Sequence, residues 1–213
     1  MRDFYNKQLK QLDTEIVHMG YFIKKAISEA IAAFSDLDVD TAKKIIEADA
    51  EIDHQEKLIE NLCMKLLLKQ QPVAGDLRQV SAALKMVTDM ERIGDHAADI
   101  SEITVTMAGV KHQKEPAHIR LMAAETIQML TDSITAYTEK DLPLAKDVIE
   151  HDDVVDSLFN KVKEEIIEIV KGVDKPGDLL VDYIMVAKYL ERIGDHACNI
   201  AEWVVFMVTG EHK

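Results

Sequence analysis

The sequence predicts an all-α protein built from two tandem, sequence-related three-helix bundles, with six helices in all. Three observations support this prediction. Helix breakers are scarce, since the 213 residues include only four prolines and eight glycines. Apolar residues recur at alternating intervals of four and three, as expected for helices that bury one face. One seven-residue segment occurs twice, which indicates a duplicated unit.

The expected helix ends follow from the breakers and from capping residues. Three joints contain both proline and glycine, at 72–75, 109–116 and 172–177. Two further joints combine acids and hydroxyls, and there Asp38 and Asp141 can accept hydrogen bonds from the first amides of a new helix. The predicted helices therefore lie near 3–34, 39–70, 76–108, 117–138, 142–171 and 178–208. The short joints between them indicate antiparallel neighbours.

Apolar spacing supports the bundle in both halves of the chain. In the third predicted helix the repeat comprises Met86, Met90, Ile93, Ala97, Ile100, Thr104 and Met107. In the fifth it comprises Val148, Val155, Leu158, Val162 and Ile169. Both sets follow the rhythm of a bundle seam, so the methionines are interpreted as core filler rather than as a metal or cofactor site.

The duplication defines two units. The segment from Glu91 to Ala97 recurs letter for letter from Glu191 to Ala197, at an offset of 100. Residues 33–53 also align with residues 136–156 at an offset of 103. We therefore predict one three-helix repeat over residues 1–110 and a second over residues 115–213.

Composition excludes several classes of function. A formal charge of −14 would repel nucleic acids and anionic lipids, so direct nucleic-acid binding is not expected. The two cysteines, Cys63 and Cys198, lie far apart and form no Cys-x-x-Cys pattern. The chain begins without an export signal and contains no long apolar stretch. A cytoplasmic protein without membrane insertion is expected.

Acidic residues interrupt the apolar stripes of four helices. Paired antiparallel helices rise equally from their joint, so distance from the joint estimates axial level. Asp53 lies 20 residues before residue 73, and Glu91 and Asp95 lie 18 and 22 residues after it. The same comparison around residue 174 places Asp152 and Asp156 level with Glu191 and Asp195. Each unit is therefore expected to gather carboxylates at one level of a helix pair.

Such a cluster is electrostatically unfavourable, and the basic residues nearby are expected to be insufficient to offset it. An all-oxygen ligand set suits Fe, Mn or Mg, with one or more ions in each unit. His96 and His196 are expected to point off the acidic face. The competing interpretation treats the acids as solvated helix faces. The predicted metal ligands are Asp49, Asp53, Glu91, Asp95, Asp99, Asp152, Asp156, Glu191 and Asp195.

These motifs resemble the PhoU family of phosphate-signalling proteins over essentially the whole chain. The resemblance rests on the tandem repeats, on the segment from Gln71 to Arg78, and on paired acids spaced by four. The paired acids are Asp49-x-x-x-Asp53, Glu91-x-x-x-Asp95, Asp95-x-x-x-Asp99, Asp152-x-x-x-Asp156 and Glu191-x-x-x-Asp195. The second unit departs from the pattern at Asn199, which replaces an acid, and lacks a counterpart of Arg78.

The resemblance implies a cytoplasmic accessory of the high-affinity phosphate ABC transporter. Such a protein restrains phosphate uptake and helps a sensor histidine kinase shut off the phosphate-starvation response. The implied partners are the transporter ATPase subunit, the histidine kinase and a second copy of the chain. Metal binds the motif acids in some members of the family.

Three functional hypotheses remain open at this point. The favoured one is a regulatory scaffold without catalytic residues or an organic cofactor. The second is a metal-dependent phosphoryl-transfer enzyme, which the sequence supports less well because it shows no phosphate-binding glycine loop and no base beside a nucleophile. The third is a helical adaptor that binds no metal.

Overall fold

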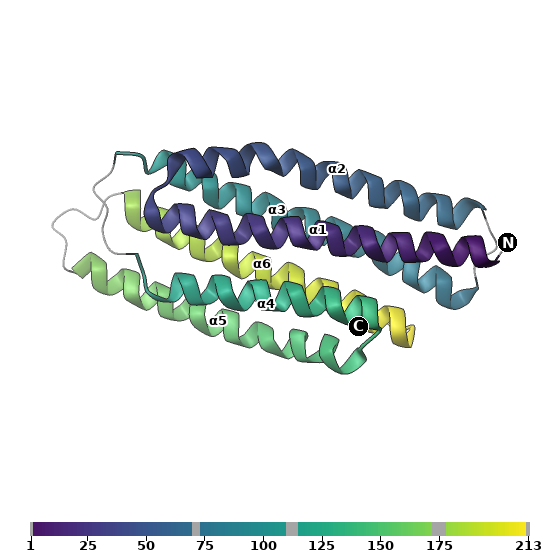
Figure 1. Ribbon diagram of the computed structural model, residues 1–213. Coiled ribbons are helices and arrows are strands. Elements are labelled where there is room, and N and C mark those ends of the chain that lie inside the picture. Colours follow the sequence, from purple (N-terminus) through teal and green to yellow (C-terminus); the bar gives the residue numbers. More distant parts are fainter. Residues whose placement is uncertain (1, 70–72, 110–114, 172–177, 212–213) are drawn as a thin grey trace.

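The computed structural model describes residues 2–69, 73–109, 115–171 and 178–211 (Figure 1). In these ranges the regular structure consists of six α-helices. They are α1 (Arg2–Asp36), α2 (Val39–Lys69), α3 (Ala74–Thr106), α4 (His118–Glu139), α5 (Leu142–Lys171) and α6 (Asp178–Thr209). The all-α prediction is confirmed, and every helix end lies within two residues of its expected place. Most of the three proline-containing joints, and Gln71 and Pro72 of the family segment, lie outside the described residues.

The two capping aspartates behave as expected. Asp38 Oδ1 accepts a hydrogen bond from the Thr41 amide at 3.0 Å, and Asp141 Oδ1 accepts one from the Leu144 amide at 3.0 Å. The residue before each aspartate has a left-handed backbone, with φ of 52° at Leu37 and 56° at Lys140. The same backbone turn therefore ends α1 and α4. This similarity supports the duplication at a position outside the acidic clusters.

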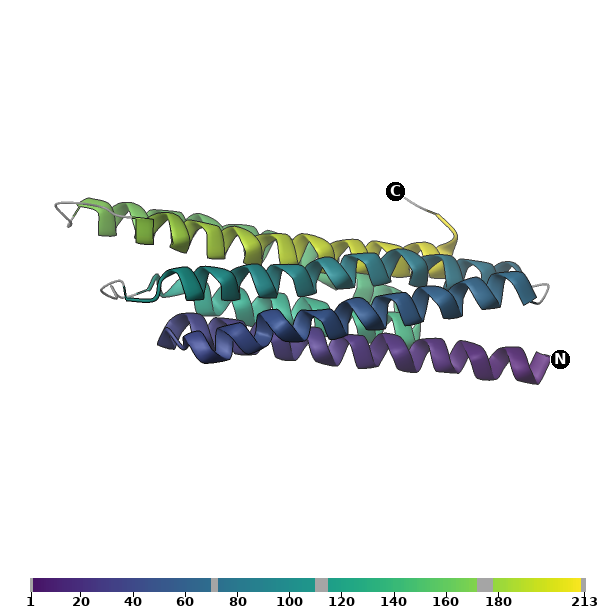
Figure 2. The same ribbon diagram turned by 90° about the horizontal axis from the view of Figure 1, so that it is seen from above.

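Successive helices run in opposite directions, and each set of three forms one unit of an elongated molecule (Figures 1 and 2). Within the first unit α1, α2 and α3 all contact one another, and within the second unit α4, α5 and α6 do the same. The units join along α3 and α6, and also where α1 meets α4. The apolar seam predicted on α3 is buried, with Met90, Ile93 and Ala97 fully inaccessible to solvent.

Gly20 allows α1 and α4 to approach closely. A Cβ atom added at this position would lie 2.3 Å from Cδ1 of Ile134 on α4. A larger residue at this position would require the Ile134 side chain to move, so Gly20 makes room for that side chain where the two units cross.

Polar contacts also join the units. The Asp89 carboxylate on α3 lies 2.8 Å from Nδ1 of His196 and accepts a hydrogen bond from Asn199 at 3.2 Å, both on α6. Arg78 Nε donates to the carbonyl oxygen of Met207 at 3.3 Å. The two departures from the repeat, Asn199 and Arg78, therefore both contribute to the junction between the units. None of the described helices is long and apolar enough to cross a membrane.

Candidate metal centre

The repeated segment contains a glycine that brings two helices together. A Cβ atom on Gly94 would lie 2.9 Å from Cδ1 of Ile52 and 3.4 Å from Oδ1 of Asp49. The counterpart, Gly194, would place a Cβ atom 3.4 Å from Oδ1 of Asp152. In each unit the absence of a side chain on α3 or α6 leaves room for an aspartate of the preceding helix to lie against the backbone.

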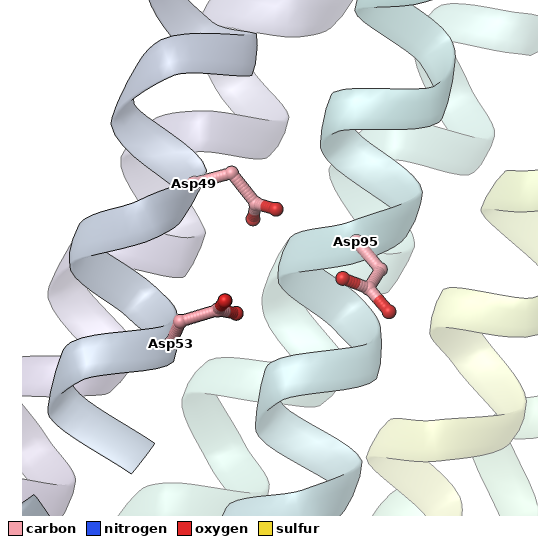
Figure 3. A group of neighbouring side chains, drawn as sticks. All are labelled: Asp49, Asp53 and Asp95. Carbon is pink, nitrogen blue, oxygen red and sulfur yellow. The ribbon is translucent and has the colours of Figure 1, made fainter. Parts of the chain in front are cut away.

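Three aspartates of the first unit converge across the α2–α3 pair. One oxygen from each of Asp49, Asp53 and Asp95 lies within 4.8 Å of the other two. Figure 3 shows Asp49 and Asp53, one turn apart on α2, pointing toward the helix that carries Asp95. All three side chains are half-buried. In the part of the chain that the structure describes, this is the only group of three or more potential metal ligands brought so close.

Electrostatics confirm that negative charge is crowded here. Burial, and then repulsion from neighbouring carboxylates, raises the pKa of Asp49 to about 6. These neighbours are Asp95, Asp53, Glu91 and Asp99. The pKa of Glu91 is raised as well, first by burial and then by Asp95. The two outer predicted ligands of the first unit, Glu91 and Asp99, thus lie close enough to act on the central trio.

Arg92 partly relieves the crowding of negative charge in the first unit, although its position next to Glu91 in the sequence suggested that it points about 100° away from the acidic face. Its Nη1 atom lies 2.8 Å from Asp95 Oδ2, and its Nε atom lies 3.5 Å from Glu91 Oε2. The long guanidinium side chain lies along the helix between Glu91 and Asp95, which the angle between adjacent residues does not anticipate. The relief is partial, because Arg92 is exposed and the pKa of Asp49 stays raised.

The second unit repeats the arrangement in a looser form. Burial, and then neighbouring carboxylates, raises the pKa of Asp152 to about 6. These neighbours are Asp195, Asp156, Glu191 and Asp153. Asp156 and Asp195 are exposed, however, whereas their counterparts in the first unit are half-buried. Asp152, Asp156, Glu191 and Asp195 therefore share one region of the surface without forming a close trio.

Three residues outside the predicted ligand set distinguish the two clusters. Glu56 adds a further carboxylate to the first unit, and its pKa is raised by burial and then by Glu60. Phe159 occupies the equivalent place in the second unit. There Lys188 forms an ion pair with Glu191 and also lies 5.6 Å from the Phe159 ring centroid. Comparing the two repeats position by position would have revealed this difference in charge.

The histidines of the repeated segment turn away from the trio, as expected. His96 Nδ1 lies 3.2 Å from Oδ2 of Asp99, and the rings of His96 and His196 lie 5.6 Å apart between α3 and α6. Asp99 therefore has a second partner besides any ion. Its counterpart Asn199 bonds across the junction between the units instead.

The carboxylates of the first unit fit a hard cation. Asp49, Asp53 and Asp95 offer only oxygen atoms, and the pKa of Asp49 is raised first by burial and then by repulsion from the neighbouring carboxylates. Cations such as Mg²⁺, Mn²⁺ or iron prefer such ligands. The nine predicted ligands thus fall into a compact group and a looser one, and their role in metal binding remains a prediction.

Comparison with known proteins gives one consistent result. A family model described as the PhoU domain matches the chain twice, over residues 16–104 and 119–204. A phosphate-specific transport system accessory protein PhoU homolog from Clostridium acetobutylicum is 36% identical over 211 residues, which cover 99% of this chain and 96% of that protein. The accessory protein PhoU of Escherichia coli is 29% identical over 97% of this chain and 86% of its own.

Solved structures agree with the sequence matches. PhoU from Pseudomonas aeruginosa superposes with a TM-score of 0.91 at 28% identity, covering 97% of this chain and 100% of the other. The phosphate transport system regulatory protein PhoU from Streptococcus pneumoniae gives a TM-score of 0.90 at 26% identity, covering 98% and 99%. Because the family model covers both units and the relatives align almost end to end, the chain belongs to the PhoU family.

Proposed function

We propose that this protein is a cytoplasmic regulator that restrains phosphate uptake and the phosphate-starvation response. The observation that carries the proposal is the match of both units to the PhoU domain, together with relatives named as accessory proteins of phosphate-specific transport. The partners in this proposal are the ATPase subunit of the phosphate ABC transporter, a sensor histidine kinase and a second copy of the chain.

Metal is proposed to organise the acidic surface of each unit. Asp49, Asp53 and Asp95 would supply the main ligands of the first site, with Glu91 and Asp99 beside them. Asp152, Asp156, Glu191 and Asp195 would supply the looser second site. A bound Fe, Mn or Mg ion supplies positive charge that relieves the repulsion, and it stabilises the fold by mass action. Chelation should therefore lower the melting temperature, whereas a metal-free adaptor would melt unchanged.

The protein is proposed to act by binding rather than by turnover. The ligand set is made of carboxylates, and Arg92, which contacts the first cluster, is already paired with two of them. The alternative is a metal-dependent phosphoryl-transfer enzyme. Reproducible hydrolysis of phosphate esters by the Mn²⁺-loaded protein, lost in Asp95→Ala, would favour that alternative.

Co-purification tests the regulatory proposal most directly. Tagged protein from phosphate-replete cells should retain the transporter ATPase and the histidine kinase, and should contain metal. The double variant Asp49→Asn/Asp53→Asn should lose the metal of the first site. The matched control Asp40→Asn/Glu47→Gln removes the same charge from exposed positions of the same helix. This control should retain the metal of the first site. Recovery of neither partner from the wild-type protein would contradict the proposal.

A further inference from the structure

A groove between α1 and α2 distinguishes the first unit. It has a volume of about 480 Å³, and its apolar lining includes Phe22, Ala26, Ile45 and Ala48. Lys25 and Lys44 stand at its rim together with three acids, Glu29, Asp49 and Glu51. The charges of the groove nearly balance, so its distinctive property is an apolar space large enough for a side chain.

The equivalent place in the second unit is nearly filled. The space between α4 and α5 measures about 110 Å³. Met129 and His151 stand there in place of Ala26 and Ala48, and Nε2 of His151 lies 2.6 Å from Glu125. Gln128 and Asp147 replace the two lysines of the rim. The same position of the fold is thus an open groove with two lysines at its rim in the first unit, and a smaller space without lysine in the second.

The outer face of α1 borders the groove and is unusual in an acidic protein. Six exposed residues follow one another at alternating intervals of four and three, as a seam of a helix pair requires. They are Lys10, Thr14, Val17, Tyr21, Lys24 and Ser28. Val17 is 48% exposed and Tyr21 is 64% exposed, so the centre of the seam is apolar and uncovered.

Lysines frame this seam. Lys10 and Lys24 lie within it, Lys7 and Lys25 lie beside it, and Lys25 belongs to the groove as well. Of these, only Lys25 has an ion pair recorded among the described residues, with Glu29 at 3.8 Å. A chain with a formal charge of −14 thus presents a strip of positive charge along one helix.

From this combination we propose that the outer face of α1 and the adjoining groove bind an acidic amphipathic helix of a partner protein. The partner helix would lie along the seam over Val17 and Tyr21, with its acids opposite the lysines and one apolar side chain in the groove. The seam from residue 10 to residue 28 is about 27 Å long at 1.5 Å per residue, which suits a partner helix of about three heptads.

Charge favours a helix over wider anionic partners. A helix is about 10 Å across, so it meets the lysine strip without approaching the acidic flanks of the molecule. A membrane surface or a nucleic-acid duplex is wider and would meet those flanks, where the net negative charge repels it. The alternating spacing of Thr14, Val17 and Tyr21 also matches a helix better than a flexible strand.

A designed peptide tests the proposal without metal, transporter or kinase, so its outcome is separate from that of the proposed function. The probe is a fluorescent peptide of three heptads with leucine at the a and d positions and glutamate at the e and g positions, which repels its own copies. Fluorescence anisotropy with the full-length protein measures its affinity at low and moderate salt. We expect binding that weakens with salt.

Two variants with matched controls locate the surface. Lys10→Glu/Lys24→Glu should weaken the peptide about tenfold, from two exposed charge reversals. The control Lys146→Glu/Lys161→Glu makes the same change in net charge on α5, which does not contact α1, and should leave binding unchanged. Ala48→His copies the residue of the second unit and should weaken binding several-fold without changing its salt dependence. The control Ala50→His places histidine at another exposed position of α2.

Four results would overturn the proposal. They are absence of peptide binding to the wild-type protein, equal losses in the α5 control, equal losses in Ala48→His and Ala50→His, and retention of binding in Lys10→Glu/Lys24→Glu. Anionic phosphatidylglycerol vesicles and an oligothymidylate serve as competing probes. If the vesicles or the oligonucleotide bound more strongly than the peptide, and if Lys10→Glu/Lys24→Glu abolished that binding, the proposal of a helical partner would also be overturned. Circular dichroism verifies that each variant is folded.

Discussion

The two units share a backbone plan but surround their carboxylates differently. Both have a capped turn before the second helix and a glycine that admits an aspartate against the helix backbone. In the first unit Asp49, Asp53 and Asp95 converge within 4.8 Å, whereas among the described residues of the second no such trio forms. A duplicated fold thus keeps the features that set helix spacing while the charges around the site diverge.

The divergence follows from how each unit compensates its acids. The first unit adds Glu56 and relies on the exposed Arg92. The second replaces that glutamate with Phe159 and supplies Lys188 to Glu191. Because Phe159 leaves the second unit with one carboxylate fewer, a bound ion has less repulsion to relieve there than in the first unit. The first site should therefore bind metal more tightly, and this difference is open to direct tests.

The pH dependence of stability tests what the two sites have in common. Asp49 and Asp152 each have a pKa raised to about 6 from 3.8, so the folded state holds their protons more tightly than the unfolded state does. The stabilisation is fully present below pH about 4 and is lost as the pH rises through about 6. One pKa unit is about 1.4 kcal/mol. Because both side chains are only half-buried, solvent screening reduces the contribution to about 1 kcal/mol each.

Chelator-treated protein should therefore unfold with a free energy about 2 kcal/mol higher at pH 4 than at pH 7 from these two groups. Denaturant titration measures this difference. Asp49→Asn and Asp152→Asn should each remove about half of it and should stabilise the metal-free protein at pH 7. If one variant removed the whole effect, the two sites would be less alike than their raised pKa values indicate.

A reciprocal exchange of one residue tests the difference in charge between the two sites. Thr88 occupies on α3 the place that Lys188 occupies on α6. Thr88→Lys should weaken Mn²⁺ binding at the first site about fivefold, and Lys188→Thr should strengthen it at the second by a similar factor, corresponding to about 1 kcal/mol for one partly screened charge. Isothermal titration measures both affinities. Lys65→Thr, which removes a lysine far from the second site, is the control. An equal gain in Mn²⁺ affinity of the second site in this variant would mean that net charge alone causes the effect.

The helical frame was predictable because it depends on local patterns. Breakers and capping aspartates fixed every helix end to within two residues, and equal rise from a joint placed Asp53 level with Asp95. These features require only the geometry of a helix and a short connection. The same breakers, caps and acids occur in both units, so the helix ends and the level of the acids predicted for one unit were supported by those predicted for the other.

The charge balance of the site was less predictable because it depends on long side chains. Arg92 reaches Asp95 by curling along its own helix, and Lys188 reaches Glu191 in the same way. Backbone angles around a helix do not specify these rotamers. The role of Asp89 at the junction between the units depends on how two bundles pack, which spacing within one helix does not reveal.

The smallest expected effect concerns the two glycines that set helix separation. A Cβ atom on Gly94 would lie 2.9 Å from the buried Ile52, whereas one on Gly194 would lie 3.3 Å from Val155, which needs to yield only a few tenths of an ångström. Replacing either glycine by alanine stabilises the helix by about 1 kcal/mol through helix propensity. Overpacking of the added methyl group costs about 1–3 kcal/mol and opposes this gain. Gly94→Ala should therefore lose about 1 kcal/mol of unfolding free energy in denaturant titration, and Gly194→Ala should stay near zero. Equal losses would mean that the two helix pairs are packed with the same tolerance, and the closer approach of the first trio would then need a cause other than helix separation.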